Sequence, residues 1–280
     1  MRPPRQRRHT LLLMEAVRGQ SPILLDTDVD MSAVLADRDR LRRLGHAPSL
    51  ISYVVWSAGR ALRAHPEANA AMTGRRRPRM TRYQQITAKV AFDKRIGSER
   101  VVVGGLISDP DRAALSDIDE TIARHKQLDI ERAPEYCAIR LLHRLPWPAA
   151  RLLFRAANMR LADRPDRLGT FSVSSLGHQP VDSFYPLGGT TVSIGIGRIR
   201  PQPVIRDGRL DGAPVMRLSL VFDHRIIDGA LAADLLAATR NHLQSWGGAP
   251  SPDADGAAQP RAAALGTLTG RSVAGLTATH

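Results

Sequence analysis

The stretch MRLSLVFDHRIIDGA, Met216 to Ala230, decides the fold of this chain. Its first half alternates Met, Leu, Leu and Phe with Arg, Ser, Val and Asp, which predicts a strand with one buried face. Its second half, DHRIIDG, places an imidazole and two carboxylates where the chain passes from that strand to a helix over 230–246. A histidine side chain can accept a proton near neutrality, so His224 is a candidate general base. From spacing alone, a structural histidine with acids that cap the helix is an equal alternative.

Working outward, strand and helix patterns alternate along most of the chain. The strands are expected at 23–30, 84–92, 100–107, 170–176, 190–199 and 215–222. The helices are expected at 31–44, 49–65, 111–127 and 230–246, with two short helices over 135–161 broken at LPWP. This last segment is amphipathic and rich in arginine, and we expect it to pack its apolar face on the protein's own core rather than on a membrane. The alternation predicts an α/β fold.

Two further motifs carry weaker signals. GIGRIR, residues 195–200, lacks the third glycine of a dinucleotide fingerprint and lies within a strand pattern, so it predicts close packing. FSVSSLG, residues 171–177, places Ser174 at a strand end. No nucleophile elbow surrounds this serine, which argues against a nucleophilic role, whereas its hydroxyl could still donate a hydrogen bond to an oxyanion. The remaining histidines show no metal-ligand spacing, and we expect no metal.

Composition narrows the class of protein. Hydrophobic residues make up 43% of the 280 residues, which is ordinary globular composition. The net charge of +13 comes almost entirely from arginine, since three of the 40 basic residues are lysines. With 4% aromatic residues there is little to stack on bases, which argues against nucleic acid. The single cysteine, Cys137, excludes an intrachain disulfide, and no apolar run is long enough to cross a membrane. We therefore expect a cytoplasmic protein.

DHRIIDG after MRLSLVF resembles the end of the catalytic domain in the acyltransferase components of 2-oxo-acid dehydrogenase complexes. Three other segments resemble that family in the right order: DTDVDMSAVLADRDRLR, HPEANAAM at the end of a buried helix, and GTFSVSSLG. The likeness runs from about Leu24 to Trp246. It implies a fold like chloramphenicol acetyltransferase, with a mixed sheet flanked by helices in two layers. It also implies a homotrimer with active sites between subunits.

The resemblance also implies roles for particular residues. His224 would be the general base that deprotonates a thiol or hydroxyl acceptor, Asp228 would support the local architecture, and Ser174 would donate a hydrogen bond to the tetrahedral oxyanion. Acyl-CoA would be the co-substrate. Arg76 and Arg77, in the cluster RRRPRMTR, are candidates for contact with CoA phosphates, with solvated loop charge as the favoured alternative.

Several segments depart from the family pattern: Gly104 and Gly105 replace an expected proline, PLGGTT replaces N-x-P, and 135–161 has no clear counterpart. We also expect no lipoyl domain and no subunit-binding domain before residue 20. The first hypothesis is therefore a stand-alone CoA-dependent acyltransferase with a small-molecule or carrier-bound acceptor. The alternative is a core dihydrolipoamide acyltransferase whose lipoyl domain lies on another chain. A catalytically silent trimeric scaffold is the alternative from another class.

Composition predicts a basic segment over 1–19, whose first ten residues we expect to be loosely held, and a tail over 247–280, rich in Ala, Gly and Pro, that we expect to be disordered. The resemblance implies that 20–246 between them form the acyltransferase catalytic domain.

Overall fold

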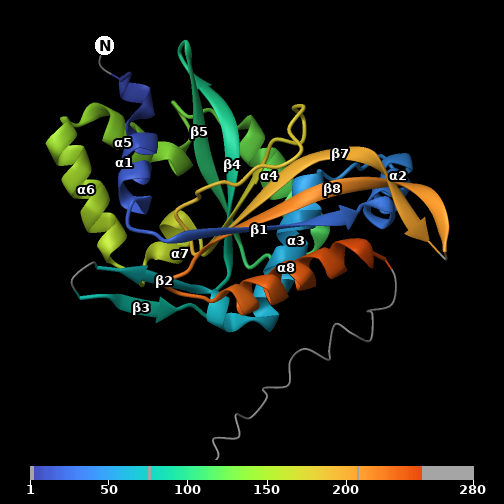
Figure 1. Ribbon diagram of the computed structural model, residues 1–280. Coiled ribbons are helices and arrows are strands. Elements are labelled where there is room, and N and C mark those ends of the chain that lie inside the picture. Colours follow the sequence, from blue (N-terminus) through green and yellow to red (C-terminus); the bar gives the residue numbers. More distant parts are fainter. Residues whose placement is uncertain (1–2, 75–76, 207, 248–280) are drawn as a thin grey trace, which may run out of the picture.

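The computed structural model describes residues 3–74, 77–206 and 208–247, which form a mixed sheet flanked by helices (Figure 1). Six strands lie in the order β1-β8-β7-β6-β4-β5. They are β1 (Pro22–Asp30), β4 (Thr87–Ile96), β5 (Glu99–Ser108), β6 (Phe171–Ser175), β7 (Val192–Arg206) and β8 (Arg209–Asp223). A separate hairpin consists of β2 (Ala70–Thr73) and β3 (Arg79–Arg82). The predicted fold class is confirmed.

Eight α-helices accompany these strands in the described residues. They are α1 (Arg8–Val17), α2 (Ser32–Arg43), α3 (Leu50–Ala64), α4 (Leu115–Gln127), α5 (Cys137–Arg144), α6 (Trp147–Met159), α7 (Arg164–Leu168) and α8 (Gly229–Gln244). Short 3-10 turns lie at Arg5–Arg7, Pro66–Ala68 and Pro134–Tyr136. The expected pair of helices broken at LPWP is therefore confirmed as α5 and α6. The expected tail lies beyond Gly247, outside the described residues.

The sheet is parallel only at its centre. β6 runs parallel to both of its neighbours, β4 and β7. β8 pairs antiparallel with both β1 and β7, and β4 pairs antiparallel with β5. β1 and β8 pair from Pro22 opposite Asp223 to Asp30 opposite Val215, so the first strand and the last strand of the chain lie side by side. This pairing fixes where β8 ends and therefore where the DHRIIDG turn begins.

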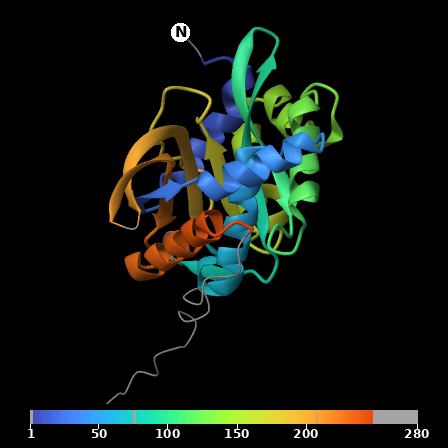
Figure 2. The same cartoon turned by 90° about the vertical axis from the view of Figure 1, so that its right-hand side faces the viewer.

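The main core lies between the sheet and the helices α3, α4 and α8 (Figures 1 and 2). Val173, Ile194, Leu220 and Leu25 come from four neighbouring strands at matching register positions and point to this side, as the alternation of strand side chains requires. The expected helix over 49–65 is confirmed as α3, which is buried over most of its length. At roughly 25 cal/mol per Å² of apolar surface removed from water, this core supplies most of the driving force for folding.

A small second core lies beyond β5, at the edge of the sheet. Leu12 of α1, Leu142 of α5 and Ala150 of α6 are buried together there, with Leu145 and Phe154 packed against them. The expectation that the first ten residues are loosely held is therefore wrong for Arg8 to Thr10, which lie in α1. The partners of Leu12 are more than 120 residues away in sequence, so the sequence pattern near residue 10 does not reveal them.

Candidate active site

His224 lies in the turn between β8 and α8, as the sequence predicts. Its backbone N–H donates to the Ser21 carbonyl over 2.9 Å, so the start of β1 holds the turn. Its side chain is 46% exposed, and Nδ1 lies 3.5 Å from Oδ1 of Asp228. With Nδ1 facing the carboxylate, Nε2 remains as the ring atom that can exchange a proton with a bound substrate.

The two acids of DHRIIDG have different surroundings. Asp228 is 88% exposed and occupies the N-cap position of α8 without a side-chain cap bond. Asp223 is buried, and its carboxylate accepts hydrogen bonds from the Ser21 and Arg225 backbone N–H groups and from the Arg225 guanidinium. Burial alone would raise the pKa of Asp223, but these hydrogen bonds outweigh it and hold the pKa below its ordinary value. Within one chain, Asp223 and Arg225 therefore build the turn that carries His224.

Ser174 lies near the end of β6 and pairs with Gly195 of β7. Gly195 in turn pairs with Ser219 of β8, and Ser219 pairs with Asp26 of β1. These four residues form one row across the sheet, on the face opposite the main core. The Ser174 hydroxyl therefore belongs to the outer sheet face, where it is half-buried.

One chain does not bring Ser174 and His224 together. His224 lies five residues beyond Ser219 along the β8 direction, which is about 16 Å at ~3.3 Å per residue. β6 and β8 are also separated by β7, which adds about 9–10 Å across the sheet. The two side chains are thus on the order of 19 Å apart, too far for both to touch one thioester carbonyl and its attacking thiol.

A cavity of ≈ 10 Å³ lies beside Asp223, Thr190 and Gln20, next to the turn that carries His224, and it is too small for an acyl thioester.

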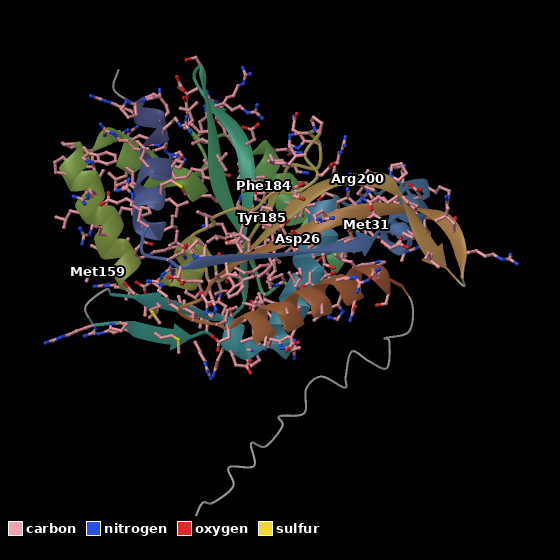
Figure 3. The ribbon with its side chains drawn as sticks, in the orientation of Figure 1. Asp26, Met31, Met159, Phe184, Tyr185 and Arg200 are labelled. Carbon is pink, nitrogen blue, oxygen red and sulfur yellow. The ribbon has the colours of Figure 1, made fainter. Side chains whose placement is uncertain are left out.

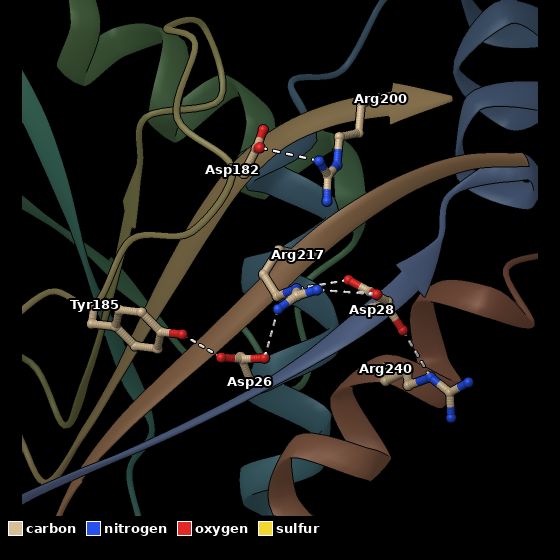
Figure 4. A network of polar contacts seen from close by, with 7 residues as sticks. All are labelled: Asp26, Asp28, Asp182, Tyr185, Arg200, Arg217 and Arg240. Atoms are coloured by element: carbon tan, nitrogen blue, oxygen red, sulfur yellow. Dashed lines mark hydrogen bonds and ion pairs between the residues drawn. The ribbon is translucent and has the colours of Figure 1, made fainter. Parts of the chain in front are cut away.

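The row that contains Ser174 continues into a polar network that sequence reasoning missed (Figure 4). Tyr185 donates its hydroxyl hydrogen to Asp26, and Arg217 of β8 binds both Asp26 (3.1 Å) and Asp28 (2.7 Å). The hydrogen bond to Asp26 and partial burial raise the pKa of Tyr185 above its ordinary value. Arg217 lies between two carboxylates on the neighbouring strand, so β1 and β8 are cross-linked on this face. The sequence signal for these contacts is the alternation of polar and apolar residues along β1 and β8, which places Asp26, Asp28 and Arg217 on the same face of the sheet.

The arginine cluster predicted for CoA lies on the β2–β3 hairpin. Arg77 is exposed near its tip, and Arg76 lies outside the described residues. The base of the hairpin is joined to the histidine turn through Thr191, whose hydroxyl donates to the Ala70 carbonyl and whose own carbonyl accepts from the Asp223 N–H. The hairpin therefore extends away from the turn that carries His224.

Two glycine-rich motifs have structural explanations. A Cβ at Gly195 would lie 1.8 Å from the Phe184 carbonyl oxygen, so the close packing predicted for GIGRIR is confirmed. A Cβ at Gly105 would lie 2.7 Å from the ring of His125, which is buried. Gly105, one of the two glycines that replace the expected proline, therefore leaves space for the buried ring of His125.

Two basic side chains, Lys89 and Arg164, contact the loop at 186–190 and were also not identified from the sequence. Lys89 donates from Nζ to the Gly188 carbonyl over 2.5 Å, and Arg164 donates to the Gly189 carbonyl over 2.5 Å. Burial, with the positive charge of Arg164, lowers the pKa of Lys89 to about 8. These contacts hold the loop that follows Tyr185 against the sheet.

The part of the chain that the structure describes holds no group of three or more His, Cys, Asp or Glu side chains placed to bind a metal ion. None of its helices is long and apolar enough to cross a membrane.

Comparison with known proteins places the family likeness in the second half of the chain. Residues 148–248 match the model "2-oxoacid dehydrogenases acyltransferase (catalytic domain)". The dihydrolipoyllysine-residue acetyltransferase component of the pyruvate dehydrogenase complex from Bacillus subtilis is 51% identical over 51 residues, which are 18% of this chain and 11% of that protein. The same component from Staphylococcus epidermidis is 36% identical over 95 residues, or 33% of this chain and 21% of that protein. The matched stretches thus span about a fifth of these relatives or less.

Solved structures support the fold over more of the chain. The dihydrolipoamide acetyltransferase of Azotobacter vinelandii superposes with a TM-score of 0.66 at 17% identity, covering 87% of this chain and 90% of that one. A probable dihydrolipoamide acetyltransferase from Listeria monocytogenes gives 0.64 at 17% identity, with 87% and 94% covered. At this identity the likeness establishes the fold.

Proposed function

We propose that this chain, whose residues 148–248 carry the catalytic domain of the 2-oxoacid dehydrogenase acyltransferases, transfers acyl groups between coenzyme A and the thiol of a dihydrolipoyl carrier. The observation that carries the proposal is His224, held by Ser21 and Asp228 at the strand-to-helix junction inside the matching segment. Its relatives in Bacillus and Staphylococcus are dihydrolipoyllysine acetyltransferases, which favours a lipoyl thiol over a small hydroxyl acceptor.

In the proposed reaction, Nε2 of His224 takes the proton of the attacking thiol. The sulfur then adds to the thioester carbonyl carbon, and the carbonyl oxygen becomes an oxyanion that accepts a hydrogen bond from the Ser174 hydroxyl. When the intermediate collapses, the bond to the leaving sulfur breaks and that thiolate takes the proton from the imidazolium. One positioned oxyanion donor is typically worth about 2.7–4 kcal/mol of transition-state stabilisation.

The site would be completed between subunits. A separation on the order of 19 Å within one chain (from ~3.3 Å per residue and ~4.8 Å per strand) cannot serve one tetrahedral intermediate. A neighbouring copy that presents its own His224 to the outer sheet face beside Ser174 solves this geometry, as the homotrimer implied by the family resemblance would. The Azotobacter structure was determined to define the roles of a serine, a histidine and an asparagine in that enzyme's mechanism, and a serine and a histidine are the residue types proposed for this site.

The arginines near the β2–β3 tip are proposed contacts for CoA phosphates. Arg77 is exposed near the tip of a hairpin whose base is joined through Thr191 to the end of β8, so a long nucleotide-bearing substrate bound at His224 would meet Arg77 if it extended along the hairpin. Guanidinium groups suit phosphate recognition because they present paired N–H donors.

The test is acyl transfer from acetyl-CoA, followed by thiol release, with three acceptors: a lipoylated carrier domain, free dihydrolipoamide and a panel of hydroxyl compounds. We expect the lipoylated domain to give the highest kcat/KM and His224→Ala to abolish that transfer. A hydroxyl compound that proves the better acceptor would replace the lipoyl proposal with the stand-alone acyltransferase. Absence of transfer to every acceptor by a folded protein would leave the scaffold hypothesis.

A further inference from the structure

The helices α1, α5 and α6 form a unit at the edge of the molecule, beyond β5 (Figure 1). The unit has its own small core, made of Leu12, Leu142 and Ala150. An ion pair between Arg151 of α6 and Glu15 of α1 joins two of its helices, with Nε 2.6 Å from the carboxylate. This helical unit contributes no residue to the row that contains Ser174 or to the turn that carries His224.

The outer face of α6 is apolar although the helix already buries its inner face. Leu152, Ala156 and Met159 are spaced i, i+4 and i+7, so they lie on one side of the helix, and all three are exposed. Leu152 is 71% exposed and Met159 is 69% exposed, and Figure 3 labels Met159 at the outer edge of the unit. Other exposed apolar residues of the unit are Leu11, Met14, Leu141, Trp147 and Leu153. Packing on the protein's own core, which the sequence led us to expect, accounts for only one face of this helix.

Positive charge surrounds this apolar stripe. Residues 136–162 contain five arginines and no aspartate or glutamate. The carboxylate that α1 contributes, Glu15, is bound by Arg151. Arg155 lies one helical turn from Leu152 and from Met159, so a cation stands within the stripe itself. A surface that covers this face must therefore accept apolar side chains and positive charge together.

We propose that the helical unit docks on an anionic phospholipid surface, with α6 lying in the plane of the interface. Exposed leucine and methionine on one side of a helix that also carries arginine is a pattern of interfacial helices, whose apolar face enters about 5–10 Å into the headgroup region. α6 has 13 residues and is about 20 Å long at ~1.5 Å per residue, enough to place both Leu152 and Met159 in that layer. A second copy of the unit is a poorer occupant because both copies carry the same excess of arginine.

The experiment is co-sedimentation of the full chain with vesicles of phosphatidylcholine alone or with 30% phosphatidylglycerol, a composition of about physiological anionic content. We expect at least about tenfold stronger binding to the anionic vesicles, weakened by added salt. The variant L152E/M159E should lose at least about tenfold of that binding. The matched control is I205E/L210E, which changes two equally exposed apolar residues (77% and 79%) by the same charge at the far end of the β7–β8 hairpin.

Figure 1 places this hairpin and the helical unit at opposite ends of the molecule, so the control should bind like the parent. Circular dichroism and Tm of both variants check that α6 still folds. The proposal is overturned if the parent binds neutral and anionic vesicles equally well. It is also overturned if a folded L152E/M159E binds as the parent does, or if I205E/L210E loses as much binding as L152E/M159E. Self-association without vesicles that L152E/M159E abolishes, or capture of an acidic protein in place of vesicles, would also overturn it.

Discussion

Mixing two inactive variants tests the separation of Ser174 and His224 more sharply than either variant alone. Ser174→Ala keeps the base and loses the oxyanion donor, whereas His224→Ala keeps the donor and loses the base. If one chain supplied both groups, every site in a mixed oligomer would lack one of them. If neighbouring chains supply them, some sites in a mixed oligomer receive an intact serine from one variant and an intact histidine from the other.

The expected recovery follows from the geometry. In a ring of identical subunits each site takes Ser174 from one chain and His224 from the next. With equal amounts of the two variants and random assembly, about one quarter of the sites have both intact groups. Each variant refolded alone lacks one of the two groups at every site, so activity above the separate variants can come only from mixed sites. The separation within one chain, about 16 Å along the strands and 9–10 Å across them, is the reason to expect such sites.

The assay is thiol release from acetyl-CoA in the presence of the acceptor chosen above. The two variants are unfolded together in denaturant, refolded and compared with each variant refolded alone. We expect about 25% of parental turnover after mixing, against a loss of about 10²-fold or more for each variant alone. Recovery that does not rise above the separate variants, in an oligomer shown by mass spectrometry to contain both chains, would refute the shared site. Full activity of a monomer in sedimentation would refute it as well.

Three further predictions concern single residues. Alone, Ser174→Ala should lower kcat by about 10²–10³-fold with little change in the KM for acyl-CoA, measured by initial rates; a change confined to KM would contradict an oxyanion role. Arg77→Ala should raise the KM for acyl-CoA several-fold at unchanged kcat, and an unaltered KM would return Arg77 to solvated loop charge. Burial, with the positive charges of His9 and Arg8, lowers the pKa of His143 to about 4, so the unfolded chain binds more protons than the folded chain between about pH 6.5 and pH 4. The free energy of unfolding should therefore fall as the pH drops through that window, with Tm falling by roughly 2–8 °C, and His143→Gln should flatten the profile; identical profiles for parent and variant would contradict this.

Much of the fold was predictable because its elements have strong local patterns. The strand before DHRIIDG and the helix at 49–65 follow from alternation and from continuous apolar character. The helix was found near the expected bounds, and the strand ends where expected but begins six residues earlier, at Arg209. α1 was missed because its stability depends on Leu142 and Ala150, far away in sequence. The short β2–β3 hairpin was missed because four-residue strands rich in arginine and threonine carry no apolar periodicity.

The site was predictable residue by residue but not as an arrangement. His224 and Ser174 were identified from their motifs, and their positions at strand ends agree with the structure. Their separation was not predictable from motifs, because it depends on the register between β6, β7 and β8. The burial of Asp223 under Arg225 was likewise hidden, since spacing alone does not distinguish a buried acid from an exposed one.

The pairing of β1 with β8 has a consequence for how the protein is made. Pro22 lies opposite Asp223, and the Ser21 carbonyl holds the His224 backbone, so nearly the whole domain must be synthesised before these contacts can form. At about 5–20 residues per second, a ribosome needs roughly 10–40 s to extend the chain from β1 to β8. Throughout that time the apolar side chains of β1 have no partner strand, and contacts so distant in sequence also form slowly. The turn that carries the histidine is therefore among the last parts of the nascent chain to take shape, and partly synthesised chains expose an open strand that chaperones must protect.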